Sequence, residues 1–504
     1  MLVDFLNNRT KSNSRILDLS ALISGLLLPF SFAPYDQSWL VYVVMSWMCL
    51  LWLHSRPGKA FWRGWLFGLG QFVIGIHWIF YSLYFHGGAP VFLAVLMVFL
   101  LASYLALFPA LTGFIAQRFF KTSNVAKLLI VIPVCWLITE WLRGYLLTGF
   151  PWLQLGYSQI DMPVVGYATW FGGLGVSFVV VLSSALLALM LSNKKYLKVY
   201  LPVLVVVWLV GLGLMKINWV TPVGDKINVS LIQGNIPQKD KWRSYMYQPT
   251  LDMYRQLTQQ HWNSDVIIWP ETAIPDYQHQ VTTYLAELKR QAEIHDKDLL
   301  LGLFIRDQQT RRYYNSVISL RDGVYQKRHL VPLGEYFPFR GALEFFRHWI
   351  NIPMSDIDSG KDDQALITMA GQPVGVSICF EDAFDRDVMS SLPEATLLVN
   401  VSNDAWFEDS PEAWQHHQIA RMRALEAGRY MLRSTNTGVS SIIDHKGRVI
   451  TASPQFERHV LVADVQPLTG ATPYTLWRNY LLIALGVLIL AVIYLRSRRN
   501  VSSS

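Results

Sequence analysis

The stretch Gly375–Phe384, GVSICFEDAF, joins an apolar strand to a thiol and two acids. Alternating Val and Ile residues predict a buried β-strand that leads directly into Cys379. Cys379 is the only cysteine in the polar half of the chain, and Glu381 and Asp382 follow it. A single thiol at the end of a strand is typical of a nucleophile that is presented for attack.

The composition divides the chain into apolar and polar parts. Of the 504 residues, 52% are hydrophobic and only 16% are charged, whereas roughly 25% are charged in typical soluble domains. Residues 1–216 and 480–504 hold nearly all of the long apolar runs, and residues 217–479 have the composition of a soluble domain. We therefore expect a polytopic α-helical membrane domain, a polar catalytic domain and a closing membrane span with a basic tail.

Apolar runs near the length of a bilayer predict seven spans in residues 1–216 and an eighth in residues 480–504. These runs lie at about 16–34, 38–54, 62–84, 90–116, 125–146, 164–192, 198–215 and 480–495. No convincing cleavage site follows the first run, so we expect an uncleaved anchor.

The distribution of basic residues predicts the orientation in the membrane. Both termini and every second loop carry clusters of Lys and Arg, whereas the other loops carry almost none. The positive-inside rule then places both termini in the cytoplasm and residues 217–479 on the periplasmic side of a bacterial inner membrane. The net charge of +7 arises in the membrane part, because residues 217–479 contain more acidic than basic residues. We therefore expect no nucleic-acid partner.

Short apolar runs alternate with helical patterns in residues 217–479, which predicts an α/β layered domain. Strands are expected at 227–233, 266–269, 299–304, 316–320, 374–379 and 396–401, and helices at 248–262, 281–294 and 414–431. The three cysteines have no paired spacing, which argues against a zinc site. His416 and His417 are adjacent and cannot share a helix face, so neither a metal nor a cofactor is expected.

Two further strand ends carry candidate catalytic residues. In DVIIWPETAIP at 265–275, Pro270 ends the strand and Glu271 follows at its carboxyl end. The segment YQKRHLVPLGEY at 325–336 carries Lys327 and Glu335. A carboxylate beside Cys379 can take the thiol proton, and a lysine can stabilise the thiolate and an oxyanion. Together these groups can support acyl transfer through a thioester without a metal.

Three motifs, WPE at 269–271, KRHLVPLGEY at 327–336 and CFE at 379–381, resemble the signature segments of the nitrilase superfamily. With the membrane spans, the whole chain resembles the bacterial apolipoprotein N-acyltransferases. The resemblance implies a four-layer αββα sandwich over about residues 226–465 with a Glu-Lys-Cys triad. Glu271 would be the general base, Lys327 the oxyanion-stabilising group and Cys379 the nucleophile.

The resemblance also implies roles for five neighbouring residues. Glu335 and Glu381 would be supporting acids, and Trp242, Asn315 and Phe380 would contribute to substrate binding. Phe380 stands where the family commonly has tyrosine, so any hydrogen bond from that hydroxyl is missing.

The implied reaction has two acyl-transfer steps. Cys379 would take an acyl chain from a membrane phospholipid, with phosphatidylethanolamine as the expected donor. The thioester would then acylate the α-amine of the diacylglyceryl-cysteine of an apolipoprotein, which is the last step of lipoprotein maturation. Two alternatives stay open: a membrane-anchored nitrilase-type amidohydrolase, and a non-catalytic scaffold that keeps the fold. The intact triad disfavours the scaffold.

The aromatic segment 336–353, YFPFRGALEFFRHWINIP, directly follows Glu335. We expect it to form a mobile lid that dips toward the membrane and admits acyl chains. An ordinary core helix is the alternative.

Overall fold

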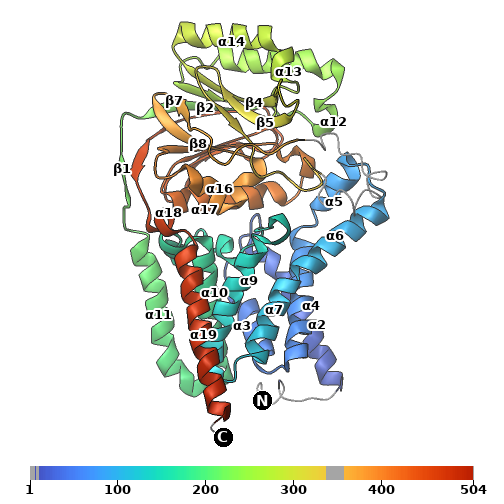
Figure 1. Ribbon diagram of the computed structural model, residues 1–504, viewed down its shortest axis with the longest axis vertical. Helices are drawn as coiled ribbons and strands as arrows, with labels where there is room; N and C mark the ends of the chain where they lie inside the picture. Colours follow the sequence, from blue (N-terminus) through green and yellow to red (C-terminus); the bar gives the residue numbers. More distant parts are fainter. Residues whose placement is uncertain (1–5, 7–10, 337–356, 503–504) are drawn as a thin grey trace. The chain divides into compact units, whose positions relative to one another are not determined.

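The structure, a computed structural model, describes residue 6, residues 11–336 and residues 357–502, so nearly all of the expected lid lies outside the described residues. The chain forms two compact units (Figure 1). The helical unit comprises Met1–His77, Val95–Ile217 and Leu476–Ser504. The sheet unit comprises Trp78–Ala94 and Asn218–Thr475. The segment Trp78–Ala94, which we assigned to the membrane part, therefore belongs to the unit that holds Cys379.

Long apolar helices make up most of the helical unit. Its main helices are α2 (Lys11–Leu27), α3 (Leu40–Leu53), α4 (Pro57–Gly75), α7 (Leu107–Arg118), α9 (Ile132–Arg143), α10 (Ala168–Ser192), α11 (Leu197–Leu214) and α19 (Tyr480–Ser502). In the described part of the chain, six helical segments are long and apolar enough to cross a bilayer, or seven if Pro57–Gly75 and Ile79–His86 form one span. Helix α3, at the expected span 38–54, has 14 residues and is shorter than this limit.

Glycines allow the helices of this unit to pack closely. A Cβ atom at Gly64 of α4 would lie 2.5 Å from the carbonyl oxygen of Pro109 in α7. A Cβ atom at Gly25 of α2 would lie 1.9 Å from the carbonyl oxygen of Phe67 in α4. Because lipid tails are as apolar as the side chains, such close backbone contacts are typical of helix association in membranes.

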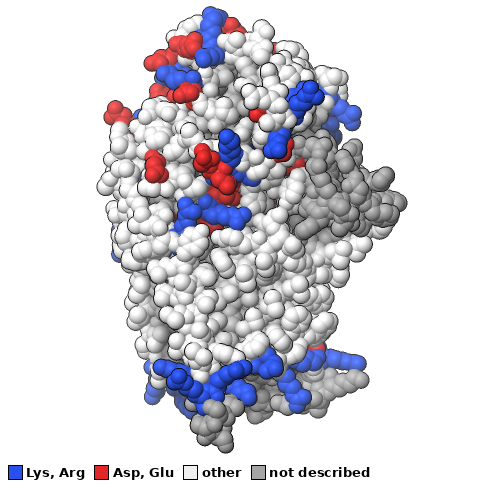
Figure 2. Space-filling model, in the orientation of Figure 1, with Lys and Arg blue, Asp and Glu red and all other residues white. Residues whose placement is uncertain are grey.

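Charged side chains are unevenly distributed over the helical unit. On the face shown in Figure 2, Lys and Arg gather at the end of the unit that holds both termini, and the belt beside this end is almost free of charge. The exposed residues of α11 and α19 are mainly Leu and Val. An apolar belt bordered by basic residues is typical of a bilayer-spanning domain, so the expected helical membrane domain is confirmed.

Two six-stranded sheets form the centre of the sheet unit. The first has the order β13 (His459–Val465), β2 (Ile227–Gln233), β3 (Val266–Ile268), β4 (Asp298–Arg306), β5 (Tyr313–Ser319), β6 (Val324–Gln326). The second has the order β12 (Val449–Ala452), β11 (Ser441–Ile443), β10 (Met431–Thr435), β9 (Leu397–Ser402), β8 (Gln372–Ile378), β7 (Ile367–Met369). In each sheet the three strands of the β2–β3–β4 or β8–β9–β10 group are parallel and the outer strands are antiparallel.

The sheets pack face to face, and helices cover their outer faces. Alternate residues of β2 point to opposite sides, so Leu231 joins the core between the sheets and Ile232 joins the core under the helices. Helices α13 (Ser244–Gln259) and α14 (Thr282–His295) cover the first sheet, and α17 (Glu412–Ala427) covers the second. These layers confirm the predicted αββα sandwich.

The expected strands and helices are present with ends that differ by a few residues, apart from one helix. The helix expected at 414–431 ends earlier, because Gly428 adopts a left-handed φ of +63° as its C-cap and the chain then enters β10. The strands from β10 to β13 were not predicted.

Replacing Gly428 by alanine is expected to destabilise the sheet unit by about 1–2 kcal/mol, since φ is positive there. The added Cβ would also lie 2.9 Å from Val220 Cγ1. The matched control is Gly371→Ala, where φ is +73° but no described atom lies within 4 Å of the added Cβ. Thermal unfolding in detergent should show a larger loss of Tm for Gly428→Ala. An equal or smaller loss would contradict this assignment.

Candidate active site

Cys379 begins a tight turn, Cys379–Ala383, at the carboxyl end of β8. Its φ of +52° lies in the left-handed region, which is unusual for a residue with a side chain and is found where the surroundings enforce it. The Cys379 carbonyl oxygen accepts hydrogen bonds from Asn400 Nδ2 at 3.3 Å and lies 3.2 Å from His416 Nε2. These contacts fix the backbone that presents the thiol.

Glu271 lies in the turn that follows β3, as its position after Pro270 predicted. Its carboxylate Oε1 accepts a hydrogen bond of 2.7 Å from Asn315 Nδ2 on β5. The backbone of this turn packs directly on Gly302 of β4. A Cβ atom at Gly302 would lie 2.6 Å from both Pro270 O and Thr272 N, so only glycine fits there. A buried carboxylate is thereby fixed at the edge of the first sheet.

Lys327 follows β6 and joins two carboxylates. Its Nζ atom lies 2.8 Å from Glu335 Oε1 and 3.6 Å from Glu271 Oε1, and its side chain is 1% exposed. Burial alone would lower the pKa of Lys327, but Glu335 and Glu271 together raise it above the ordinary lysine value. Glu335 is itself held by Asn315 Nδ2 at 3.1 Å and by the Val331 amide at 2.8 Å. Lys327 is therefore a permanent cation.

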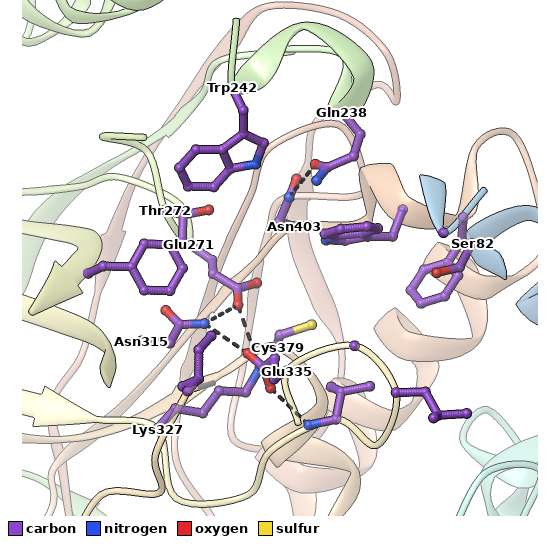
Figure 3. A pocket seen from close by; sticks show the side chains of 18 of the residues that line it. Ser82, Gln238, Trp242, Glu271, Thr272, Asn315, Lys327, Glu335, Cys379 and Asn403 are labelled. Atoms are coloured by element: carbon purple, nitrogen blue, oxygen red, sulfur yellow. Dashed lines mark hydrogen bonds and ion pairs between the residues drawn. The ribbon is translucent and has the colours of Figure 1, made fainter. Parts of the chain in front are cut away.

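A cavity that is open to solvent brings these groups together (Figure 3). Six of the predicted site residues line it: Trp242, Glu271, Asn315, Lys327, Glu335 and Cys379. Much of the remaining wall is apolar and includes Leu83, Val331, Leu333, Trp406 and Phe407. The arrangement combines a nucleophile, a base and a cation with space for a hydrophobic substrate.

Part of the cavity wall comes from the segment Trp78–Ala94. Ser82, Leu83 and Gly87 of this segment line the cavity. Trp78 Nε1 donates to Gln415 Oε1 at 3.1 Å, and His86 Nε2 lies 3.0 Å from Glu408 Oε1. These contacts hold an apolar segment from the amino-terminal half of the sequence beside the predicted catalytic residues.

Phe380 and Glu381 do not occur among the described residues that line the cavity. The Phe380 ring packs on Phe384, with 5.0 Å between ring centroids. Glu381 is fully buried and accepts hydrogen bonds from the amides of Ile378 at 2.7 Å and Arg328 at 2.6 Å. Burial raises the pKa of Glu381 to about 7, although these hydrogen bonds favour its ionised form. Its contacts join the nucleophile turn to the chain beside Lys327.

A buried charge cluster behind Cys379 was not predicted from the sequence. His416 Nε2 lies 2.7 Å from Asp382, and Arg433 pairs with Asp382 at 3.2 Å and with Asp404 at 3.1 Å. Ligand atoms of Asp404, Glu412 and His416 lie within 4.8 Å of one another, which is a possible metal-binding arrangement. Arg433 already forms an ion pair with the Asp404 carboxylate. We therefore describe the cluster as an ion-pair network that supports the turn at Cys379–Ala383.

The Cys379 thiol is only partly accessible, and its surroundings disfavour the thiolate. Burial and the negative charge of Glu271 raise the pKa of the thiol to about 12, although Lys327 and His416 oppose this shift. The thiol is therefore protonated at neutral pH. Attack by Cys379 requires a base, and the Glu271 carboxylate in the same cavity can provide it.

The αββα sandwich, with Glu, Lys and Cys side chains together at its strand ends, is the arrangement expected of the nitrilase class. A carbon-nitrogen hydrolase family model matches residues 228–474. A second model, described as the apolipoprotein N-acyltransferase N-terminal domain, matches residues 24–186.

Relatives match nearly the whole chain. The apolipoprotein N-acyltransferase of Methylococcus capsulatus is 45% identical over 96% of this chain and 97% of its own length. That of Coxiella burnetii is 38% identical over 94% of this chain and 99% of its own length. The chain therefore belongs to the apolipoprotein N-acyltransferase family, which confirms the predicted resemblance. Among solved structures, Saccharomyces cerevisiae Nit3 is 18% identical over 51% of this chain and 95% of its own, with a TM-score of 0.36.

The raised thiol pKa predicts slow alkylation of Cys379. In a Cys49→Ala/Cys135→Ala background, iodoacetamide should modify Cys379 more slowly than free cysteine at pH 8, and the rate should still rise from pH 8 to 10. Lys327→Met should slow the reaction further, because Lys327 stabilises the thiolate. The exposed Lys289→Met is the control and should change nothing. A rate that levels off below pH 8 would show an already ionised thiol.

Proposed function

We propose that this chain transfers an acyl chain from a membrane phospholipid to the α-amine of the diacylglyceryl-cysteine of apolipoproteins, through a thioester on Cys379. The observation that carries the proposal is the position of the Lys327 ammonium between Glu271 and Glu335 in the cavity that Cys379 lines. Membership of the family supports the acceptor and a membrane-lipid donor.

In the first step, the Cys379 sulfur attacks the ester carbonyl of the phospholipid and the thiol proton passes to Glu271. The carbonyl oxygen becomes an oxyanion, which the Lys327 ammonium stabilises. The carbon–oxygen ester bond then breaks, and Glu271 returns its proton to the leaving alkoxide. The products are the Cys379 thioester and a lysophospholipid.

In the second step, the neutral α-amine of the apolipoprotein attacks the thioester carbonyl. Glu271 accepts a proton from the attacking nitrogen, and Lys327 again stabilises the oxyanion. The carbon–sulfur bond breaks, the amide forms, and the proton held by Glu271 returns to the Cys379 sulfur. Glu335 and Asn315 keep Lys327 and Glu271 in place during both steps.

The apolar wall of the cavity supports a lipid donor. Leu83, Trp406 and Phe407 offer a surface for an acyl chain, and Trp242, which is 40% exposed, lies at the same cavity. We propose phosphatidylethanolamine as the donor; vesicles that differ only in headgroup would test this choice through the rate of thioester formation.

The proposed topology is an inner-membrane protein with cytoplasmic termini and a periplasmic catalytic domain at residues 217–479. The basic residues at the end of the helical unit that holds both termini support this orientation (Figure 2). In spheroplasts, an impermeant thiol reagent should label a Lys289→Cys variant and leave an Arg498→Cys variant unlabelled. The reverse pattern would contradict the orientation.

Substitutions of Glu271 and Lys327 should slow acyl transfer strongly. Glu271→Gln is expected to lower the rate of thioester formation by about 10²–10⁴-fold, because the thiol then has no base. Lys327→Met should lower it by about 10²–10³-fold through loss of oxyanion stabilisation. Both rates can be measured by lysophospholipid release with purified protein in phospholipid micelles.

The exposed Glu293→Gln serves as the control for these substitutions and should keep the wild-type rate. Acylation of an acceptor peptide should decrease in parallel with lysophospholipid release. Wild-type rates for Glu271→Gln would overturn the proposed mechanism. Release of free fatty acid without an acylated peptide would instead indicate a hydrolase.

A further inference from the structure

A second lysine, Lys241, lies directly behind Glu271. It ends the short helix α12 (Gln238–Lys241), immediately before Trp242, and is 2% exposed. Its Nζ atom donates to Thr272 Oγ1 at 2.5 Å and to the Glu271 carbonyl oxygen at 3.2 Å. Across the described ranges, no carboxylate forms an ion pair with Lys241 within 4.0 Å.

Burying an ammonium group without an ion pair has a high desolvation cost, so other favourable interactions must offset this cost. Burial lowers the pKa of Lys241 to about 8, although the negative charge of Glu271 opposes this shift. Lys241 is therefore mostly protonated at pH 7. The Glu271 carboxylate, the proposed base, offsets part of the cost of burying this charge.

The turn that Lys241 contacts adopts an unusual conformation. Thr272 has a φ of +46°, which is uncommon for a β-branched residue. Gly302 packs against one side of this turn without space for a Cβ atom. Lys241 holds it through the Glu271 carbonyl and the Thr272 hydroxyl. Lys241 therefore contacts the backbone from which the Glu271 carboxylate extends.

The charges around Glu271 also require a second cation. Lys327 lies 3.6 Å from Glu271 but only 2.8 Å from Glu335, so one ammonium serves two carboxylates. Asn315 donates to both carboxylates and carries no charge. Among the described residues that line the cavity, the remaining titratable group is the Cys379 thiol. With Lys241 included, two carboxylates are balanced by two ammonium groups.

We propose that Lys241 is a positioning residue that holds the Glu271 turn in place and supplies positive charge beside the base. This inference rests on the proposed role of Glu271 as the base. Loss of this cation would remove an attractive charge interaction with Glu271, so the acidic limb of the rate profile should move to higher pH.

The test compares Lys241→Met with Lys239→Met, since Lys239 lies on the same short helix but is exposed. Thioester formation on Cys379 is followed from pH 5 to 9 in rapid-quench experiments with phospholipid micelles. Lys241→Met should be at least tenfold slower at pH 7, and the acidic limb of its rate profile should move to higher pH. Lys241→Arg should retain the wild-type acidic limb, and Lys239→Met should behave as wild type.

An unchanged acidic limb in folded Lys241→Met would overturn the proposal, even if the rate fell. If Lys241→Met does not fold, the proposal is tested with Thr272→Val instead. This substitution removes the hydrogen bond from Lys241 to Thr272 and keeps the charge of Lys241. We expect it to form the thioester several-fold more slowly with an unchanged limb, and a wild-type rate would refute the role of Lys241. Failure of the wild-type protein to form a thioester would instead refute the proposed function.

Discussion

The buried ion pairs of Lys327 with Glu335 and Glu271 are the interaction on which the rest of the site depends. A charge removed from water must be paired, and removal of one partner of such a pair typically costs about 3–5 kcal/mol. This requirement joins the turn after β3, the chain after β6 and strand β5 through Asn315. Cys379 reaches the same cavity from the second sheet. The face-to-face packing of two sheets therefore assembles the site from three strand ends.

The nucleophile is protected and made reactive by the same surroundings. The protonated thiol resists alkylation and oxidation, which matters for a cysteine on the periplasmic side of a membrane, as we propose here. The buried cluster of Asp382, His416 and Arg433 supports the left-handed turn at Cys379, and the charge of His416 favours the thiolate. Reactivity then depends on a base that acts only when the substrate is in place.

Sequence patterns predicted those parts of the structure that local chemistry determines. Continuous apolar runs predicted β2, β3, β4 and β8, and a proline or an acid after the strand indicated Glu271 and Cys379. Strands β10, β11 and β12 have only three to five residues, which is too short for a clear apolar pattern, and the seven-residue β13 was missed as well. Lys241, Arg433 and Leu83 were missed because their roles come from contacts with residues far away in the sequence, which no local spacing reveals.

Mass spectrometry of the trapped enzyme shows directly whether the acyl chain is carried on Cys379. Wild-type protein is incubated with phosphatidylethanolamine of one defined acyl chain and no acceptor, and then digested with trypsin. We expect the acyl mass on Cys379 in the peptide of residues 362–386, and we expect a diacylglyceryl-cysteine peptide to remove it. Acyl transfer to the acceptor without this adduct, or an adduct on another residue, would contradict a thioester intermediate on Cys379.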